Sequence, residues 1–296
     1  MKIKRFFEIT CVAVVVLCSF FYLDSYQEEI LLYKIRNIPL EDFAILEAFF
    51  RILVLEEGGA YVLFGSKPMA FTAYFTSSDV YNNISRKWYL YSENRTIQVG
   101  WEVWKKYRHR FPSSRFVLES KPFDECRAEI CLIDRNKFKK TIKSHLEDFQ
   151  SIFGLEKTSA KILEEYQQGN RALFKLLEEH HAALGILLGF GRENALQFHE
   201  RAMKMGKDPN LAQEVSLKAP LPFIEFVDKS PLQSAFNQKH PRTCYKFLSL
   251  PYFLADPRLR ETQELKYQYL QQRRQIQKEY AHGHFLEMTL KRFCSS

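Results

Sequence analysis

The stretch of sequence that decides the fold runs from residue 171 to residue 205 and reads RALFKLLEEHHAALGILLGFGRENALQFHERAMKM. From Leu173 onward, leucines recur at helical spacing on one face, and further along they occupy all sides of the expected helix. This pattern is typical of a helix that passes from the surface into a core. Gly189 and Gly191 can adopt a positive φ, so we expect the first helix to end there and a second to begin near Arg192. The stretch predicts a buried helical hairpin with a glycine corner, and by itself it shows no chemistry.

The N-terminus predicts an export signal, because basic residues within the first five positions precede the uncharged apolar run Ile9–Leu23. Small residues at the spacing of a cleavage site are nearly absent. We therefore expect residues 1–23 to form an uncleaved membrane anchor, with a signal peptide as the alternative, and residues 24–38 to form a juxtamembrane linker. The prediction is a single-pass membrane protein with its C-terminal domain exported, or else a secreted or periplasmic protein.

Composition excludes disorder, because 46% of the 296 residues are hydrophobic and a chain of this length can bury a full core. The formal net charge is +8, and residues 86–143 hold 15 Lys or Arg against seven Asp or Glu. This segment therefore accounts for the whole positive excess.

The pattern of the remaining chain predicts an α+β fold that is predominantly helical. We expect one globular domain over residues 39–296, with a small antiparallel or mixed sheet within about residues 60–133 packed by helices, behind one N-terminal hydrophobic helix. The expected strands are 60–64 and 69–75, joined as a hairpin, together with 116–118, 128–133 and 223–227. The expected helices are 37–59, 99–110, 136–153, 159–168, 257–280 and 285–293.

Two glycine-containing turns suggest an anion-binding pocket as one hypothesis. Gly65–Pro68 lacks the full phosphate-loop pattern and is interpreted as a turn. Backbone amides after the glycine corner could hold an anion with Arg192, although Glu193 already places a negative charge there. A real site should bring Lys67, Arg192 and a histidine into one concave pocket, whereas an interaction scaffold should keep them apart.

The helix expected over residues 99–110 combines aromatic and basic residues. It is interpreted first as a solvated face, since cations near a helix C-terminus are favoured by the dipole alone. The alternative is a contact with a protein partner or with anionic lipid. Nucleic acid is not an expected partner, because the chain carries no recognition motif. The candidate contacts are Trp101, Trp104, Lys105, Lys106, Arg108 and Arg110.

No metal, cofactor or catalytic residue is predicted. Cys126 and Cys131 could form a disulfide in an oxidising compartment, or they could be free buried thiols, and their spacing does not make a zinc site. His180 and His181 are adjacent on a helix, where side chains point about 100° apart, so they cannot both bind one ion. The sequence contains no HExxH motif, nucleophile elbow or kinase signature.

Three segments carry a family resemblance: residues 59–68 (GAYVLFGSKP), residues 184–195 (LGILLGFGRENA) and residues 250–257 (LPYFLADP), the last followed by Glu261 and Thr262. They resemble uncharacterised, N-terminally anchored proteins of chlamydia-like bacteria, for which no activity is assigned. The resemblance implies a place in the bacterial envelope and no catalytic residue.

The leading functional hypothesis is a non-enzymatic interaction or structural protein of the envelope, with another envelope protein or anionic lipid as partner. Its contact faces would be the basic aromatic helix and the long polar helix near the C-terminus. The alternative is an enzyme or small-ligand-binding protein with an anion-binding pocket near Lys67 and Arg192.

Overall fold

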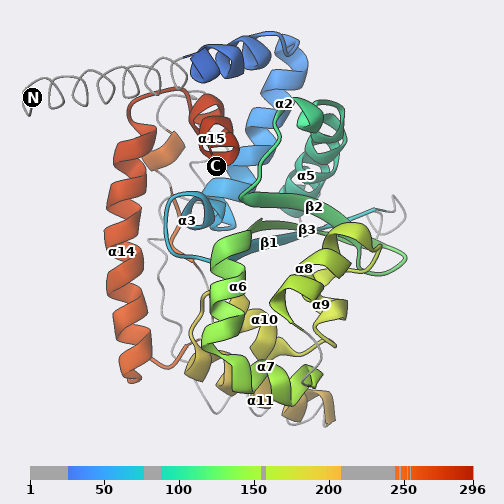
Figure 1. Ribbon diagram of the computed structural model, residues 1–296, viewed down its shortest axis with the longest axis vertical. Helices are drawn as coiled ribbons and strands as arrows, with labels where there is room; N and C mark the ends of the chain where they lie inside the picture. Colours follow the sequence, from blue (N-terminus) through green and yellow to red (C-terminus); the bar gives the residue numbers. More distant parts are fainter. Residues whose placement is uncertain are drawn as a thin grey trace, which may run out of the picture.

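The protein is described by a computed structural model over residues 26–76, 88–154, 158–207, 244–246, 248–251, 253 and 255–295. Helices cover both faces of a small central sheet (Figure 1), so the described part of the chain forms three layers. This arrangement confirms the predicted α+β fold with predominantly helical content.

The sheet contains three antiparallel strands in the order β1-β3-β2. Side chains alternate along the central strand, with Ile130 and Leu132 in one hydrophobic core and Cys131 and Ile133 in the other. The central strand is therefore buried on both sides. The strands are β1 (Met69–Phe75), β2 (Phe116–Pro122) and β3 (Arg127–Asp134).

The helices of the first layer enclose a core rich in aromatic residues. Trp104 lies at its centre, 1% exposed, with its ring against those of Phe50, Phe111 and Phe293. The elements of this layer are α2 (Leu40–Arg51), the π-helix η1 (Ile52–Glu56), α3 (Gly59–Leu63), α5 (Trp88–Tyr107), the 3-10 helix η2 (Arg108–Arg110), α14 (Arg260–Tyr280) and α15 (Phe285–Cys294).

The second layer covers the opposite face of the sheet with shorter helices, while the long α14 runs along the edge of the molecule beside both layers (Figure 1). The helices of this layer are α6 (Arg135–Ser144), α7 (Leu146–Phe153), α8 (Ser159–Gln168), α9 (Leu173–Leu176), α10 (His181–Leu187) and α11 (Arg192–Lys207). The predicted glycine corner is confirmed between α10 and α11, where Gly189 and Gly191 have φ values of 74° and 89°.

The predicted hairpin of residues 60–64 with 69–75 is wrong, because residues 59–63 form the helix α3 and β1 pairs with β3 instead. Gly58 adopts a φ of 78° and turns the chain into this helix. Donors from outside the helix satisfy its last carbonyls: Lys137 Nζ binds Val62 O, and Arg292 Nε binds Leu63 O. Tertiary contacts thus override the β propensity of the sequence AYVLF.

Two predicted helices are interrupted, and one predicted linker is helical. The helix expected over 136–153 breaks at His145, whose φ of −120° and ψ of 37° lie outside the helical range. The first helix of the hairpin divides into α9 and α10, because Glu178 and Glu179 have φ values of 54° and 57°. Residues 26–36, predicted as linker, form a helix. The strand expected at 223–227 lies outside the described residues.

The prediction of a single-pass membrane protein is corrected. Among the described residues, no helix combines the length and the apolar character that a membrane span requires. The two longest helices of that part, α5 and α14, carry charged side chains along their length. The apolar segment at residues 9–23, on which the prediction was based, lies outside the described residues, and we withdraw the transmembrane assignment.

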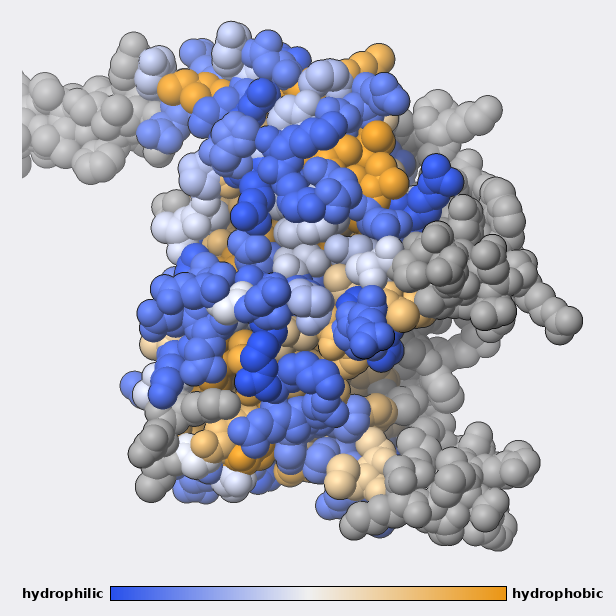
Figure 2. Space-filling view, turned by 90° about the vertical axis from the view of Figure 1, so that its right-hand side faces the viewer, coloured by the Kyte–Doolittle hydropathy of each residue, from blue (hydrophilic) through white to orange (hydrophobic). Residues whose placement is uncertain are grey.

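The surface seen from the α5 and α9 side is mainly hydrophilic, and hydrophilic residues separate its hydrophobic areas (Figure 2). The exposed large hydrophobic residues include Tyr33 and Leu40 near the N-terminal end of the described chain, at 69% and 85% exposure. No extended apolar face is visible in this view.

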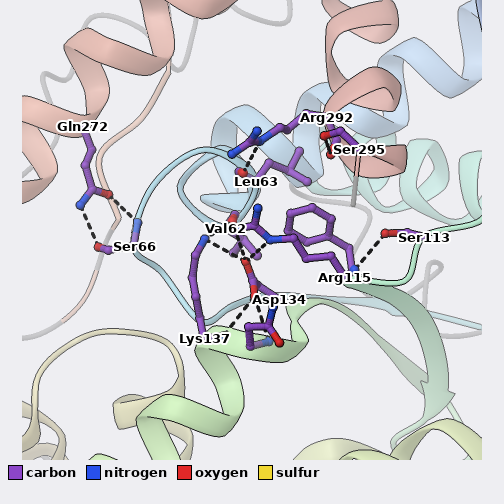
Figure 3. Close-up of polar contacts among 12 residues, drawn as sticks. Val62, Leu63, Ser66, Ser113, Arg115, Asp134, Lys137, Gln272, Arg292 and Ser295 are labelled. Carbon is purple, nitrogen blue, oxygen red and sulfur yellow. Dashed lines mark hydrogen bonds and ion pairs between the residues drawn. The ribbon is translucent and has the colours of Figure 1, made fainter. Parts of the chain in front are cut away.

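Polar contacts fix the turn between α3 and β1 from two sides (Figure 3). Ser66 donates its backbone N–H to Gln272 Oε1 at 3.0 Å, and Gln272 Nε2 donates to Ser66 Oγ at 2.7 Å. On the other side, the buried carboxylate of Asp134 binds Arg115 and Lys137, and Lys137 reaches α3. The turn that contains Lys67 is therefore held rigidly between α14 and α6.

Candidate functional site

The N-terminus of α11 holds an anion, and the anion is a side chain of the protein itself. Glu261 of α14 accepts hydrogen bonds from the backbone N–H groups of Arg192 at 2.7 Å, Glu193 at 2.9 Å and Asn194 at 3.3 Å. A carboxylate at this position satisfies unpaired amides and complements the helix dipole. The predicted anion-binding corner therefore exists but is already filled.

The side chain of Arg192 is also committed within the fold. Its Nε and Nη2 donate to the two carboxylate oxygens of Asp148 in α7, each at 2.7 Å. This bidentate pair ties α11 to α7 on the surface. Arg192 consequently does not face a ligand site, which corrects its prediction as an anion contact.

Glu261→Ala should lower the free energy of unfolding by about 1–2 kcal/mol, because three amides of α11 lose their acceptor. Urea denaturation would measure the change. Glu264→Ala is the matched control on the same helix, since Glu264 is exposed and pairs with the exposed Arg260. We expect its free energy of unfolding to change by less than about 0.5 kcal/mol. Sulfate should stabilise Glu261→Ala more than the wild type by binding the vacated amides. Equal stability of the two variants would contradict the capping role.

A cavity of about 250 Å³ lies beside the glycine corner, between α10, α11 and the segment that contains Phe253. Its walls are almost entirely apolar, and the rings of Phe190 and Phe253 stack with centroids 4.6 Å apart. A cavity of this kind is suited to a compact ligand rather than to a drug-sized one, for which roughly 300–1,000 Å³ is typical. The apolar lining residues are Leu184, Gly185, Leu188, Phe190, Ala195, Phe198 and Phe253.

Two polar residues reach the cavity wall, and only one has free hydrogen-bonding capacity. Asn194 is 1% exposed, and both ends of its amide are bonded within the protein. Its Oδ1 accepts hydrogen bonds from Thr262 Oγ1 at 3.0 Å and from the Asp256 N–H at 3.2 Å. Its Nδ2 donates to Phe190 O at 3.1 Å. The side chain of His181 makes ring contacts with Phe174, Phe198 and His199 and no hydrogen bond to the described residues. His181 is therefore the group that can bind a polar atom of a ligand.

Electrostatics keep the imidazole of His181 neutral near pH 7. Burial lowers its pKa below the usual value, and His199 lowers it further. The neighbouring His180 has its pKa lowered by the same two causes, and its ring stacks on that of His199 with centroids 3.8 Å apart. A neutral His181 has one donor and one acceptor nitrogen and can bind a hydroxyl, carbonyl or N–H group.

Lys67 lies behind the cavity, on the far side of one aromatic residue of its wall. Its side chain is only 3% exposed, and its Nζ lies 5.6 Å from the centre of the Phe190 ring. Within the described part of the chain, no hydrogen bond or ion pair is made by this ammonium group. Burial lowers the pKa of Lys67 to about 8, although the charge of Glu57 opposes the shift.

Three glutamates form an acidic group next to Lys67, at the end of η1. Burial raises the pKa of Glu57 to about 7 with help from Glu93, and burial and Glu93 also raise the pKa of Glu56 to about 7. Thr72 Oγ1 donates to Glu57 at 3.5 Å. In the part of the chain that the structure describes, no group of His, Cys, Asp or Glu residues is arranged to hold a metal ion.

The structure does not assemble the predicted pocket of Lys67, Arg192 and a histidine. A histidine, His181, lies on the cavity wall, Lys67 approaches the wall from behind Phe190, and Arg192 points to α7. Sequence reasoning singled out Lys67 for its place in a glycine turn. It missed the cavity, because apolar residues that line a cavity look the same in a sequence as residues that fill a core.

The residues predicted to contact a partner or anionic lipid occupy two different environments. Trp101 and Trp104 are 4% and 1% exposed, so they belong to the core and are unavailable to a partner. Lys105, Lys106 and Arg108 are exposed and partly neutralised, since they pair with Glu102, Asp42 and Glu119 in that order. Arg110 is half-buried and lies over the Tyr107 ring. A contact through these basic residues alone stays a prediction.

The predicted disulfide is not formed, since Cys126 and Cys131 both carry free thiols. Cys131 is fully buried in β3, where burial raises the pKa of its thiol far above the usual value. The alternative of a buried thiol therefore describes Cys131.

Comparison of the chain with protein-family models, curated proteins and solved structures finds no match in any of the three.

Proposed function

We propose that this protein binds a small, largely apolar molecule in the cavity between α10 and α11. The observation that carries the proposal is the cavity of about 250 Å³ with aromatic and aliphatic walls, beside an imidazole with free hydrogen-bonding capacity. Apolar walls supply most of the affinity of such sites, and a small number of polar groups fixes the orientation of the ligand. The ligand class is a compact ring compound with one polar group that His181 binds.

The stacked pair of Phe190 and Phe253 supports an aromatic ligand in particular. The angle between the planes of the two rings is 13°. Phe190 belongs to the glycine corner, and Phe253 comes from a distant part of the chain. A flat ligand can extend this stack or meet the edge of Phe198, because aromatic rings prefer offset or edge-to-face contacts.

Saturation-transfer NMR with benzamide, p-cresol and indole would test the proposal. We expect a signal for at least one compound with the wild-type protein and a loss of at least ten-fold in affinity in Leu188→Trp, because the larger ring fills the cavity. Met203→Trp is the matched control, since Met203 lies on α11 and is 48% exposed. Failure of all three compounds to bind, or equal binding to Leu188→Trp, would overturn the proposal.

A further inference from the structure

The ammonium group of Lys67 has no hydrogen-bond acceptor among the described residues. Only 3% of the residue is exposed to solvent. A charged group with so little solvent contact is stabilised by an acceptor within hydrogen-bond distance. Among the described residues, the ammonium group faces the ring of Phe190 at 5.6 Å and is acted on by the charge of Glu57. An aromatic face provides a weak substitute for an oxygen acceptor.

The side chain of Lys67 extends between Gly58 and Gly189, which both have a positive φ. A Cβ added to Gly58 would lie 3.0 Å from Lys67 Nζ. One added to Gly189 would lie 2.6 Å from Tyr269 Oη and at an ordinary contact distance of 3.4 Å from Lys67 Cγ. The lysine thus reaches Phe190 along the backbone of the two glycines.

Phe190 is the residue that separates the amine from the cavity. Its ring lines the cavity and also receives the Lys67 ammonium group. Gly189 and Gly191 flank it, and the residue is partly exposed. A shift of this one ring would join the cavity to the space beside Lys67.

We propose that the ligand of this cavity carries a carboxylate, and that Lys67 binds this carboxylate when the Phe190 ring moves aside. The inference rests on the proposed function and narrows its ligand class to small aromatic acids. The apolar part of the acid occupies the cavity, and its oxygens provide the acceptor that the buried ammonium lacks. A charge-assisted hydrogen bond of this kind is stronger than one between neutral groups.

The charges around Lys67 set the pH range in which an acid binds. Glu57 is the charged group that acts on Lys67, and Glu93 of α5 acts on Glu57. Glu93 and Glu57 also act on Glu56 of η1. Below pH 7 Glu57 is largely neutral and Lys67 charged, so the site is positive. Above pH 8 Glu57 is charged and Lys67 is largely neutral, so the site repels an acid. The lowered pKa of His181 reduces the positive charge of its imidazole in this range.

The test compares phenylacetate with its neutral isostere phenylacetamide by NMR titration of the full chain at pH 6.5 and pH 9. We expect the wild-type protein to bind phenylacetate at least ten-fold more tightly than the amide at pH 6.5, and to lose this preference at pH 9. Lys67→Met removes the charge with little change of shape and should abolish the preference while leaving amide binding in place. Lys175→Met is the control, because Lys175 is exposed and pairs with Glu179.

The outcomes separate the two proposals. Binding of the amide without any preference for the acid at pH 6.5, or an unchanged preference in Lys67→Met, would overturn the assignment of a carboxylate and keep the cavity as a binding site. Binding of neither compound would contradict both. If Lys67→Met does not fold, the pH comparison on the wild-type protein decides, and an acid preference that persists at pH 9 would refute the role of Lys67.

Discussion

Replacing Trp104 by alanine should lower the free energy of unfolding by about 3–5 kcal/mol, which is the range for deleting a large aromatic side chain from a packed core. Trp104 is 1% exposed. Its ring meets Phe50 at 5.2 Å, Phe293 at 5.9 Å and Phe111 at 6.0 Å between centroids. Trp104 thus joins α2, α5 and α15. Urea denaturation followed by far-UV circular dichroism, a probe that does not depend on tryptophan fluorescence, would measure the loss in the free energy of unfolding.

Two further variants distinguish core packing from a surface contact. Trp104→Phe should cost less than about 2 kcal/mol, since the ring is kept and the buried indole N–H has no acceptor among the described residues. Val99→Ala on the same helix, where Val99 is 37% exposed, should change stability by less than about 1 kcal/mol. Unchanged stability of Trp104→Ala would instead support the original prediction that Trp104 faces a partner.

Local patterns predicted the elements whose ends carry clear signals. The helix expected from residue 136 follows Asp134, a residue type that favours the N-cap, and the side chain of Asp134 accepts from the N–H groups of Asn136 and Lys137. Residues 159–168 were predicted as a helix and form α8 with the same bounds. The glycine corner also follows from local backbone preference, because a positive φ strongly favours glycine at positions 189 and 191.

The failures concern segments whose conformation is decided by distant residues. Residues 60–63 are all buried, so the sequence shows neither a helical nor an alternating pattern. The carbonyls at the end of that helix depend on Lys137 and Arg292, which lie 75 and 229 residues further along the chain. No local rule could indicate these donors.

The candidate site was predictable only in part, for the same reason. Lys67 could be singled out from its glycine turn, but its burial depends on Phe190 and Gly58, which the fold brings to it. The anion at the start of α11 comes from Glu261, 69 residues after Arg192. A helix N-terminus in a sequence shows that an anion is favoured there, and it cannot show whether the protein or a ligand supplies it.

The second large effect is expected at Asp134, whose buried carboxylate links β3, α6 and the segment before β2 (Figure 3). Its side chain is 0% exposed and binds Arg115 Nε at 2.9 Å, Lys137 Nζ at 3.2 Å and two backbone N–H groups of α6 at 3.0 Å. Asp134→Ala removes the helix cap and leaves both cations without their partner, so we expect a loss of about 3–5 kcal/mol in the free energy of unfolding at pH 7.

The pH dependence of this loss tests its electrostatic origin. Burial alone would raise the pKa of Asp134, but hydrogen bonds from Lys137 and Arg115 and the charge of Lys137 outweigh burial and lower the pKa below the usual value. A carboxyl group with a lowered pKa in the folded state contributes stability above its unfolded pKa, and this contribution disappears as pH falls through the folded pKa. The difference between wild type and Asp134→Ala should therefore shrink below about pH 4.

Asp134→Asn separates the charge from the cap, because its amide oxygen still accepts from the N–H groups of Asn136 and Lys137 while the negative charge is lost. We expect its stability to lie between those of the wild type and Asp134→Ala at pH 7. Glu102→Ala is the surface control, since Glu102 is exposed and pairs with the exposed Lys105. The stability of this variant should hardly differ from that of the wild type. A loss in Asp134→Ala that stays constant from pH 7 to pH 3 would show that packing, and not the buried charge, holds this junction and the turn of Lys67 that it supports.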